Sequence, residues 1–232
     1  MARLYLGTSG WSYTEWKGKF YPAKIAGEEM LPFYAQHFDA VELNNSFYRL
    51  PKPETMAKWR DAVPQGFRFA LKAPQQITHR RRLIDVAEPV QRFLESAAVM
   101  GLAAGPVLFQ LPPNMRADVE RLSGLLALLP LGQQVAFEFR HDSWLDESVF
   151  ELLRRHDAAL CLAETDEAVA PLLPASGFVY LRLRKSDYTD DELAAWRDKL
   201  NTLVQAGRDV YCFFKHENSA KGPEYVLSVM RG

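Results

Sequence analysis

The sequence predicts one α/β domain over residues 1–232, a single (β/α)₈ TIM barrel with eight parallel strands. Eight apolar runs recur along the chain, and segments with helical spacing lie between them. Alternation of strands with helices is typical of a parallel sheet. Eight such units in 232 residues match a compact barrel, whereas a doubly wound sheet usually has fewer units or a glycine-rich phosphate loop after its first strand.

Each element follows from its local pattern. The predicted strands are the apolar runs at 4–7, 40–44, 67–72, 107–111, 135–140, 159–164, 178–183 and 210–215. The predicted helices have apolar residues three and four positions apart and lie near 28–38, 53–63, 90–98, 118–129, 146–156, 189–207 and 223–230, with a short, weak one at 168–173. The helix at 189–207 has the clearest ends, because it begins with the capping-box pattern TDDE and stops at Gly207.

Composition narrows the class of protein. The 28 basic residues nearly balance 29 acidic ones, which gives a net charge of −1 and no overall basic surface for nucleic acid. Cys161 and Cys212 are flanked by apolar residues and are expected to be reduced. No signal-peptide apolar region and no run of membrane-spanning length is apparent. We therefore expect a soluble cytoplasmic protein without a membrane partner.

Several predicted strands alternate between apolar and polar residues, although barrel strands are usually apolar throughout. Side chains change face at every position, so Phe137 and Phe139 should meet the helices while Glu138 and Arg140 point into the barrel. The same rule places further polar side chains inside: Glu42, Asn44, Arg68, Lys72, Gln110, Tyr180, Arg182 and Arg184. Most of them lie near the C-terminal ends of the strands, where barrels of this kind carry their active sites.

Five blocks of sequence, in order, resemble the YecE-like family, the seventy-second of the catalogued domains of unknown function. These blocks are GTSGWSYTEWKGKFYP (7–22), VELNNSFYRLP (41–51), LKAPQQITH (71–79), LFQLPP (108–113) and EFRHDSW (138–144). The resemblance implies a (β/α)₈ barrel over nearly the whole chain and supplies no reaction. A likeness to apurinic-site endonuclease barrels has been proposed for the family at the level of fold. The chain departs from the family pattern at YLRLRK (180–185) and FFKHENSAKGP (213–223).

We expect an enzyme that binds an anionic small molecule bearing phosphate, carboxylate or sugar groups and acts on it by acid-base, hydrolase-like chemistry. The predicted catalytic residues are Glu138 and Glu42, carboxylates on separate strands, and His141, whose ordinary pKa lies near neutrality. Arginine and lysine side chains gathered at the C-terminal end of the barrel favour binding of anions. The predicted substrate-binding residues are Lys72, Arg140, Arg182, Asn44, Gln110, Trp11, Tyr13, Trp16, His79, Trp144 and Lys215.

Alternatives remain open at this stage. No metal or other cofactor is predicted, because several cations point at the same mouth; a divalent metal held by loop histidines and glutamates is the alternative. The aromatic residues of the first loop either stack on a ligand or form their own small core. The basic run HRRR (79–82) is compatible with an endonuclease-like, nucleic-acid-binding repair protein. A ligand-binding scaffold without catalysis would use the same pocket.

Overall fold

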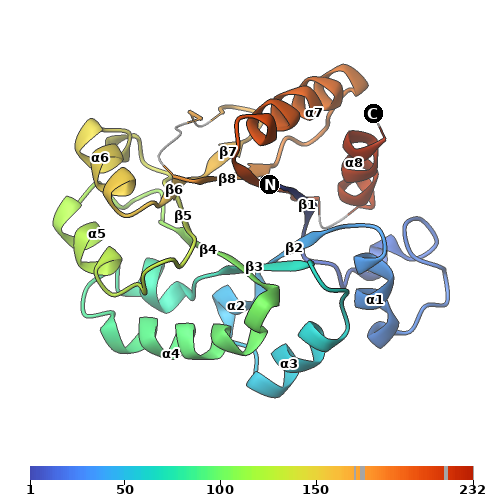
Figure 1. Ribbon diagram of the computed structural model, residues 1–232, viewed down its shortest axis with the longest axis horizontal. Coiled ribbons are helices and arrows are strands. Elements are labelled where there is room, and N and C mark those ends of the chain that lie inside the picture. Colours follow the sequence, from blue (N-terminus) through green and yellow to red (C-terminus); the bar gives the residue numbers. More distant parts are fainter. Residues whose placement is uncertain (170, 173–175, 217–218, 232) are drawn as a thin grey trace.

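The computed structural model describes residues 1–169, 171–172, 176–216 and 219–231. Its strands form one sheet in the order β6-β5-β4-β3-β2-β1-β9-β8-β7, and every neighbouring pair is parallel. The strands are β1 (Leu4–Ser9), β2 (Ala40–Leu43), β3 (Arg68–Lys72), β4 (Ala104–Gln110), β5 (Val135–Glu138), β6 (Ala159–Leu160), β7 (Leu162–Glu164), β8 (Phe178–Leu183) and β9 (Asp209–Phe214). Figure 1 shows them as a ring with the helices outside it.

The ring closes through one short stretch of chain. β6 pairs with β5 and β7 pairs with β8, and only Cys161 separates β6 from β7. Both edges of the sheet therefore belong to residues 159–164, which makes the sheet a nearly closed parallel barrel. The sequence predicted one strand here and eight in all. The nine described strands differ from that count because the chain is divided at Cys161, whose backbone N–H bonds the carbonyl of Phe137 at 2.8 Å.

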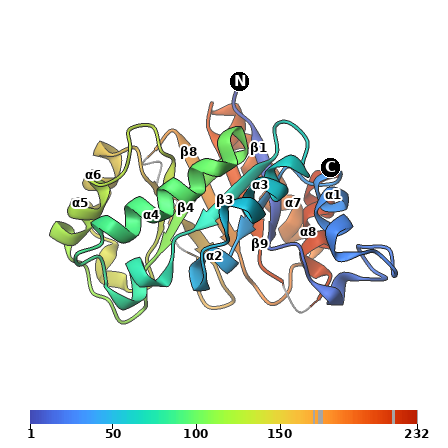
Figure 2. The same ribbon diagram turned by 90° about the horizontal axis from the view of Figure 1, so that it is seen from below.

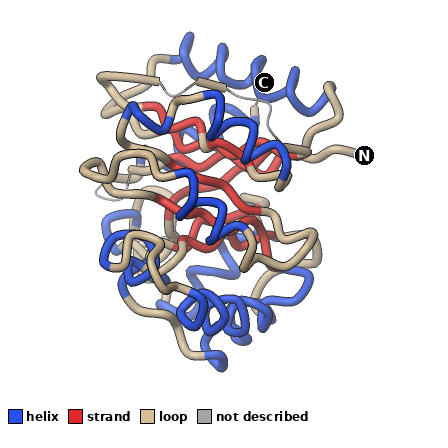
Figure 3. Tube along the Cα trace, turned by 90° about the vertical axis from the view of Figure 1, so that its left-hand side faces the viewer, coloured by secondary structure: helices blue, strands red, loops and turns tan. Residues whose placement is uncertain are grey.

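Helices surround the barrel, as the side views show (Figures 2 and 3). They are α1 (Met30–Ala35), α2 (Asn45–Tyr48), α3 (Pro53–Asp61), α4 (Ala87–Ala97), α5 (Val119–Leu126), α6 (Glu147–Arg155), α7 (Asp190–Gln205) and α8 (Lys221–Met230). The capping box predicted before α7 is confirmed, with Thr189 and Glu192 bonding each other's backbone N–H groups. Within the described part of the chain, no helix combines the length and apolar character that a membrane crossing requires.

The short helix predicted at 168–173 differs from the structure at its first residues. At the N-terminal end of the segment 168–173, Val169 pairs with Glu164 in an isolated antiparallel bridge. Residues 170 and 173 lie outside the described residues. The sequence also gave no signal for two short helical turns that follow strands, α2 after β2 and a π-helical turn at Gln76–Arg80 after β3.

The alternation of side chains along the strands is confirmed. Phe69 and Phe137 pack in the large apolar core between the barrel and its helices. Ala70 and Ala136 belong to a second, smaller apolar cluster with residues of the other strands. Small residues on several strands of the inner face leave room for the large polar side chains that share it. The fold thus concentrates polar groups above a narrow apolar interior.

Gly7 tests the packing of the barrel against its first helix. A Cβ at this position would lie 1.8 Å from the Ala40 carbonyl oxygen and 2.9 Å from the Tyr34 hydroxyl. Tyr34 cannot yield easily, because its hydroxyl donates to that carbonyl at 3.0 Å and accepts the Thr8 N–H at 2.8 Å. Gly7→Ala should therefore lower the free energy of unfolding by about 3 kcal/mol or more, measured by urea denaturation.

Gly27→Ala is the matched control, because an added Cβ at Gly27 meets nothing within 4 Å. Its unfolding curve should stay close to that of the parent protein. Equal stability of the two variants would contradict the close approach of β1 and β2.

Candidate functional site at the barrel mouth

A buried arginine joins two buried glutamates from opposite parts of the chain. Arg182 in β8 donates to Glu42 Oε1 from Nε at 3.2 Å and from Nη2 at 2.8 Å. Its Nη1 donates to Glu138 Oε2 at 2.5 Å. All three side chains are at most 1 % exposed. Because an unpaired buried charge costs several kcal/mol, the three groups have to be treated as one unit.

Glu42 is held in its ionised form. Tyr180 donates its hydroxyl to Glu42 Oε2 at 2.7 Å, and Ser9 donates to Oε1, also at 2.7 Å. Burial alone would raise the pKa of Glu42, but the charge of Arg182 and these hydrogen bonds outweigh burial and hold the pKa below its ordinary value of 4.5. The carboxylate has partners on both oxygens and contributes a fixed negative charge to the interior.

Glu138 has the densest set of donors. Besides Arg182, Gln110 Nε2 donates to Oε2 at 2.9 Å, Arg140 Nε donates to Oε1 at 3.0 Å, and Arg184 Nη2 lies 3.2 Å from Oε1. Burial would raise the pKa of this carboxyl group, but the three neighbouring guanidinium charges lower it far below its usual range. Glu138 is therefore ionised at neutral pH.

Lys72 connects to the same group through an amide. Its Nζ donates to Gln110 Oε1 at 2.9 Å and lies 4.1 Å from the centre of the Phe47 ring. The backbone carbonyl of Lys72 accepts from the Ser46 hydroxyl at 2.7 Å, which holds the end of β3. Burial and the positive charge of Arg182 lower the pKa of Lys72 to about 8. The pKa of Lys72 therefore lies closer to neutrality than the ordinary lysine value of 10.5.

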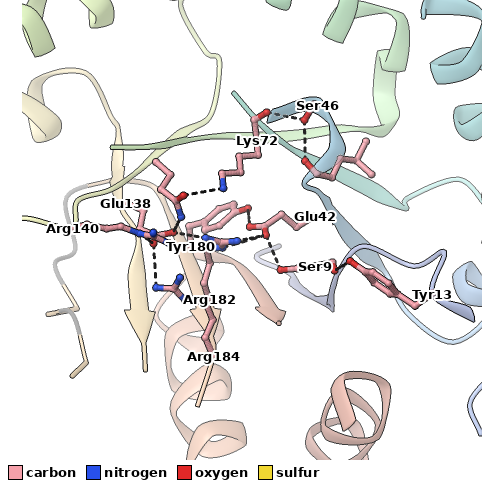
Figure 4. A network of polar contacts seen from close by, with 12 residues as sticks. Ser9, Tyr13, Glu42, Ser46, Lys72, Glu138, Arg140, Tyr180, Arg182 and Arg184 are labelled. Carbon is pink, nitrogen blue, oxygen red and sulfur yellow. Dashed lines mark hydrogen bonds and ion pairs between the residues drawn. The ribbon is translucent and has the colours of Figure 1, made fainter. Parts of the chain in front are cut away.

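The network carries more positive than negative charge. Two carboxylates, Glu42 and Glu138, face four cationic side chains: Lys72, Arg140, Arg182 and Arg184. Figure 4 shows these side chains converging from different strands. Exposure divides them into a buried inner layer around Arg182 and an outer layer in which Arg184 is 15 % and Arg140 35 % exposed. The uncompensated positive charge therefore lies on the side of the solvent.

Two buried hydrogen-bond donors at the barrel mouth lack a partner in the part of the chain that the structure describes. Asn44 Nδ2 and Arg184 Nε are buried without a hydrogen bond among the described residues. Because unsatisfied buried donors cost about 1–3 kcal/mol each, they are rare and call for an acceptor. Both follow strands at the same end of the barrel, β2 and β8. These two unpaired donors and the excess of cationic side chains both favour binding of an anionic group with several acceptor oxygens at the mouth.

His79 lies beside the network, whereas the other loop histidines have local roles. Burial and the charges of Lys72 and Arg140 lower the pKa of His79, whose ring packs edge-on against Phe47 at 4.8 Å. His141 caps the turn Asp142–Trp144, with Nδ1 accepting the Ser143 N–H at 3.1 Å. The ring of His216, by contrast, contacts the Lys185 carbonyl through Nε2 at 2.6 Å.

Lys215 follows β9 and is half-buried; its backbone N–H bonds the Leu183 carbonyl at 3.0 Å. Its role in substrate binding and that of His141 in proton transfer stay predictions. Sequence reasoning did not name Ser9 as a site residue. The alternation of side chains could have identified it, because Ser9 is two positions after Gly7 in β1 and therefore lies on the same face of the strand.

The aromatic residues predicted to face a ligand pack instead in the core. Trp11 is 7 % exposed and meets the Trp59 ring edge-on at 5.1 Å. Trp16 is 1 % exposed, and Trp144 is fully buried and stacked on Phe139 at 4.6 Å. The half-buried Tyr13 donates its hydroxyl to the Ser9 carbonyl. This burial favours the small-core alternative for the first loop, and a role of these indole rings in substrate binding stays a prediction.

The donor set of the mouth does not resemble a metal site. In the described ranges, no three His, Cys, Asp or Glu side chains gather closely enough to hold a metal ion. The two glutamates of the network are occupied by guanidinium groups, which repel a cation.

Arg182→Met should destabilise the protein strongly. The change leaves Glu42 and Glu138 buried without their shared counter-ion, and breaking a buried pair typically costs about 3–5 kcal/mol. Arg155→Met is the control, since Arg155 forms a surface pair with Glu151 on α6 and such pairs contribute at most about 1 kcal/mol. Urea denaturation at pH 7 measures both. A small effect of Arg182→Met, equal to that of the control, would contradict the buried bridge.

The pH dependence of stability should report on Glu138. Its pKa is lower in the folded protein than the ordinary 4.5 of an unfolded chain, so its contribution is complete above pH 4.5 and is lost as the pH falls below that value. Glu138→Gln removes this contribution. The difference in unfolding free energy between parent and variant should therefore be largest at pH 7 and shrink by pH 3, and a constant difference would argue against an ionised Glu138.

Comparisons with known proteins agree with this architecture. A family model described as a protein of unknown function, DUF72, matches residues 5–231. The chain is 32 % identical to the UPF0759 protein YecE of Escherichia coli K12 over 139 residues, 60 % of this chain and 48 % of YecE, so the match spans about half the length of that relative. It is 26 % identical to the UPF0759 protein YunF of Bacillus subtilis 168, covering 93 % of this chain and 89 % of YunF.

Two solved structures share the fold. A DUF72 family protein of Thermotoga maritima MSB8 has a TM-score of 0.87 at 24 % identity, covering 98 % of both chains. One from Enterococcus faecalis V583 has a TM-score of 0.78 at 19 % identity, covering 100 % of this chain and 97 % of the other. At these identities the likeness concerns the fold alone. The family match over nearly the whole chain confirms the resemblance found in its motifs: this protein belongs to the DUF72 family, together with YecE and YunF.

Proposed function

We propose that β6 and β7 act as one strand of an eight-unit barrel whose C-terminal mouth binds a small anionic molecule. The observation that carries the proposal is the charge of the network, in which four cationic side chains face only two carboxylates. Four positive charges against two negative ones leave two uncompensated positive charges, on the side of Lys72, Arg140 and Arg184. This charge is available for a phosphate or carboxylate group, and Asn44 has a spare N–H.

The proposed chemistry is acid-base catalysis of a hydrolase-like reaction. Glu42 and Glu138 stay ionised at neutral pH, so neither serves as a general acid there. In this proposal they act as fixed anions that orient the cations. Proton transfer belongs to a group whose pKa lies near the working pH. Lys72 meets that condition. The second candidate for proton transfer is His141, whose Nδ1 accepts the Ser143 N–H and leaves Nε2 for the substrate.

The proposal also explains why the protein buries charged side chains at this site despite their desolvation cost. A barrel interior that served stability alone would be packed with apolar side chains, because well-packed hydrophobic residues often replace buried ion pairs without loss of stability. Here the ion pairs continue outward to Arg184 and Arg140, whose side chains are 15 % and 35 % exposed. Buried ionisable groups arranged in this way cluster at functional sites.

Isothermal titration calorimetry with inorganic phosphate and with small sugar phosphates tests the site. Arg140→Gln should weaken binding about ten- to hundred-fold, because a charge-assisted hydrogen bond contributes about 1.5–3 kcal/mol. Arg154→Gln is the matched control: Arg154 is similarly exposed and paired with Glu147, but it lies on α6. Its affinity should equal that of the parent.

Loss of affinity in both variants, or no saturable binding by the parent at low ionic strength, would contradict the proposed site. Turnover of the bound sugar phosphate, followed as released phosphate, separates an enzyme from a binding scaffold. Salt-dependent binding of abasic or single-stranded oligonucleotides that is insensitive to Arg140→Gln would instead favour the nucleic-acid alternative around residues 79–82.

A further inference from the structure

Lys72 is a buried amine without a carboxylate partner. It is 8 % exposed, and among the described residues no carboxylate oxygen lies within ion-pair distance of its Nζ. Two other lysines of the protein are paired with acids: Lys185 with Glu192, and Lys221 with Asp187 at 3.0 Å. A lysine placed only to complete a charge network would be expected to contact a carboxylate. Lys72 is held by a neutral amide and an aromatic ring instead.

The surroundings of Lys72 fix the position of its nitrogen and leave it weakly paired. Gln110 Oε1 accepts one N–H, and the orientation of this amide is set in turn by Glu138, which accepts from Gln110 Nε2. The Phe47 ring covers another side of the nitrogen at 4.1 Å. Neither neighbour supplies a negative charge. Figure 4 shows the side chain extending from the end of β3 toward Glu138 and the cations around it.

This environment favours the neutral amine. Burial penalises the ammonium form most, and the positive charges of Arg182 and Arg140 add to the effect. Together they outweigh the more distant charges of Glu42 and Glu138, so the pKa falls from 10.5 to about 8. A desolvated lysine beside another cation is the arrangement that activates amine nucleophiles, because only the neutral nitrogen has a lone pair to donate. At neutral pH a useful fraction of Lys72 is in that form.

We propose that Lys72 forms an imine with a small aldehyde or ketone that also carries a carboxylate or phosphate. The inference rests on the proposed anion site, because Arg140 and Arg184 would hold the charged group while the carbonyl carbon meets the Lys72 nitrogen. It names a substrate class for that site: anionic carbonyl compounds.

The reaction balances without an oxidant or reductant. The Lys72 nitrogen attacks the carbonyl carbon, the carbon–oxygen bond then breaks, and a protonated imine forms as the oxygen leaves in a water molecule. Counted from the ammonium form, the nitrogen loses two of its three protons, and both depart in that water. The imine keeps a positive charge at the place where the ammonium stood, so the charges of the network change little.

Reductive trapping tests the inference on the unaltered protein. The protein is incubated with glyoxylate, an anionic aldehyde, and then with sodium borohydride, which fixes an imine as a stable secondary amine. Peptide mass mapping should locate the modification at Lys72 in preference to every exposed lysine. The labelling rate of Lys72 should rise with pH around 8, where its amine becomes neutral, whereas an ordinary lysine reaches that point near 10.5.

Variants and a neutral probe sharpen the test. Lys72→Arg should abolish the specific label, whereas Lys199→Arg should not, although Lys199 also lies over an aromatic ring, 4.6 Å from the centre of Trp196. Acetaldehyde lacks the anionic group and should label Lys72 at least ten-fold more slowly than glyoxylate at equal concentration.

The failures are distinguishable. Phosphate binding that depends on Arg140, without any trapped product at Lys72, would overturn the imine and leave the anion site standing. Labelling of Lys72 by acetaldehyde as fast as by glyoxylate would overturn the anionic substrate class and count against the anion site. Uniform labelling of exposed lysines with Lys72 unmodified would overturn the whole inference.

Discussion

The bridge from Arg182 to Glu42 and Glu138 determines how the rest of the mouth is organised. Three hydrogen bonds use every nitrogen of this guanidinium group, and both carboxylates are buried beneath it. The bridge connects β8 with β2 and β5 across the inside of the barrel, so it depends on closure of the sheet. Because desolvation makes each of these charges costly alone, the barrel and the bridge require each other.

The excess of positive charge at the mouth follows from the arrangement of side chains around this bridge. Arg182 contacts both glutamates but balances only one of their two negative charges. Arg140 and Arg184 both contact the same oxygen of Glu138, and Lys72 reaches the group through Gln110. The same interaction therefore anchors the interior and leaves cations toward solvent. The charge of Arg182 lowers the pKa of both glutamates against the effect of burial. Burial is the larger cause of the lowered pKa of Lys72, and the charge of Arg182 adds to it.

The strand alternation of side chains made much of the site predictable. Glu42, Gln110, Glu138 and Arg182 could be placed inside because a strand reverses its side chains at every residue, a rule independent of tertiary context. Their pairing could not be predicted, since Arg182 and Glu42 are 140 positions apart. Nor could the sequence show whether Trp16 stacks on a ligand or packs in a hydrophobic core, because an aromatic side chain is suited to both roles. The division of 159–164 depends on the local geometry of barrel closure, which leaves no mark in composition.

A crystal structure of the protein soaked with tungstate, an electron-dense analogue of phosphate, tests the central claim most directly. Uncompensated cations at the mouth should hold the ion among Lys72, Arg140 and Arg184, visible as an anomalous peak within hydrogen-bond distance of at least two of these side chains, with Arg182 still bridging both glutamates. A mouth filled by protein side chains, with tungstate bound only at other surface arginines, would contradict the account and identify the network as a structural ion-pair layer.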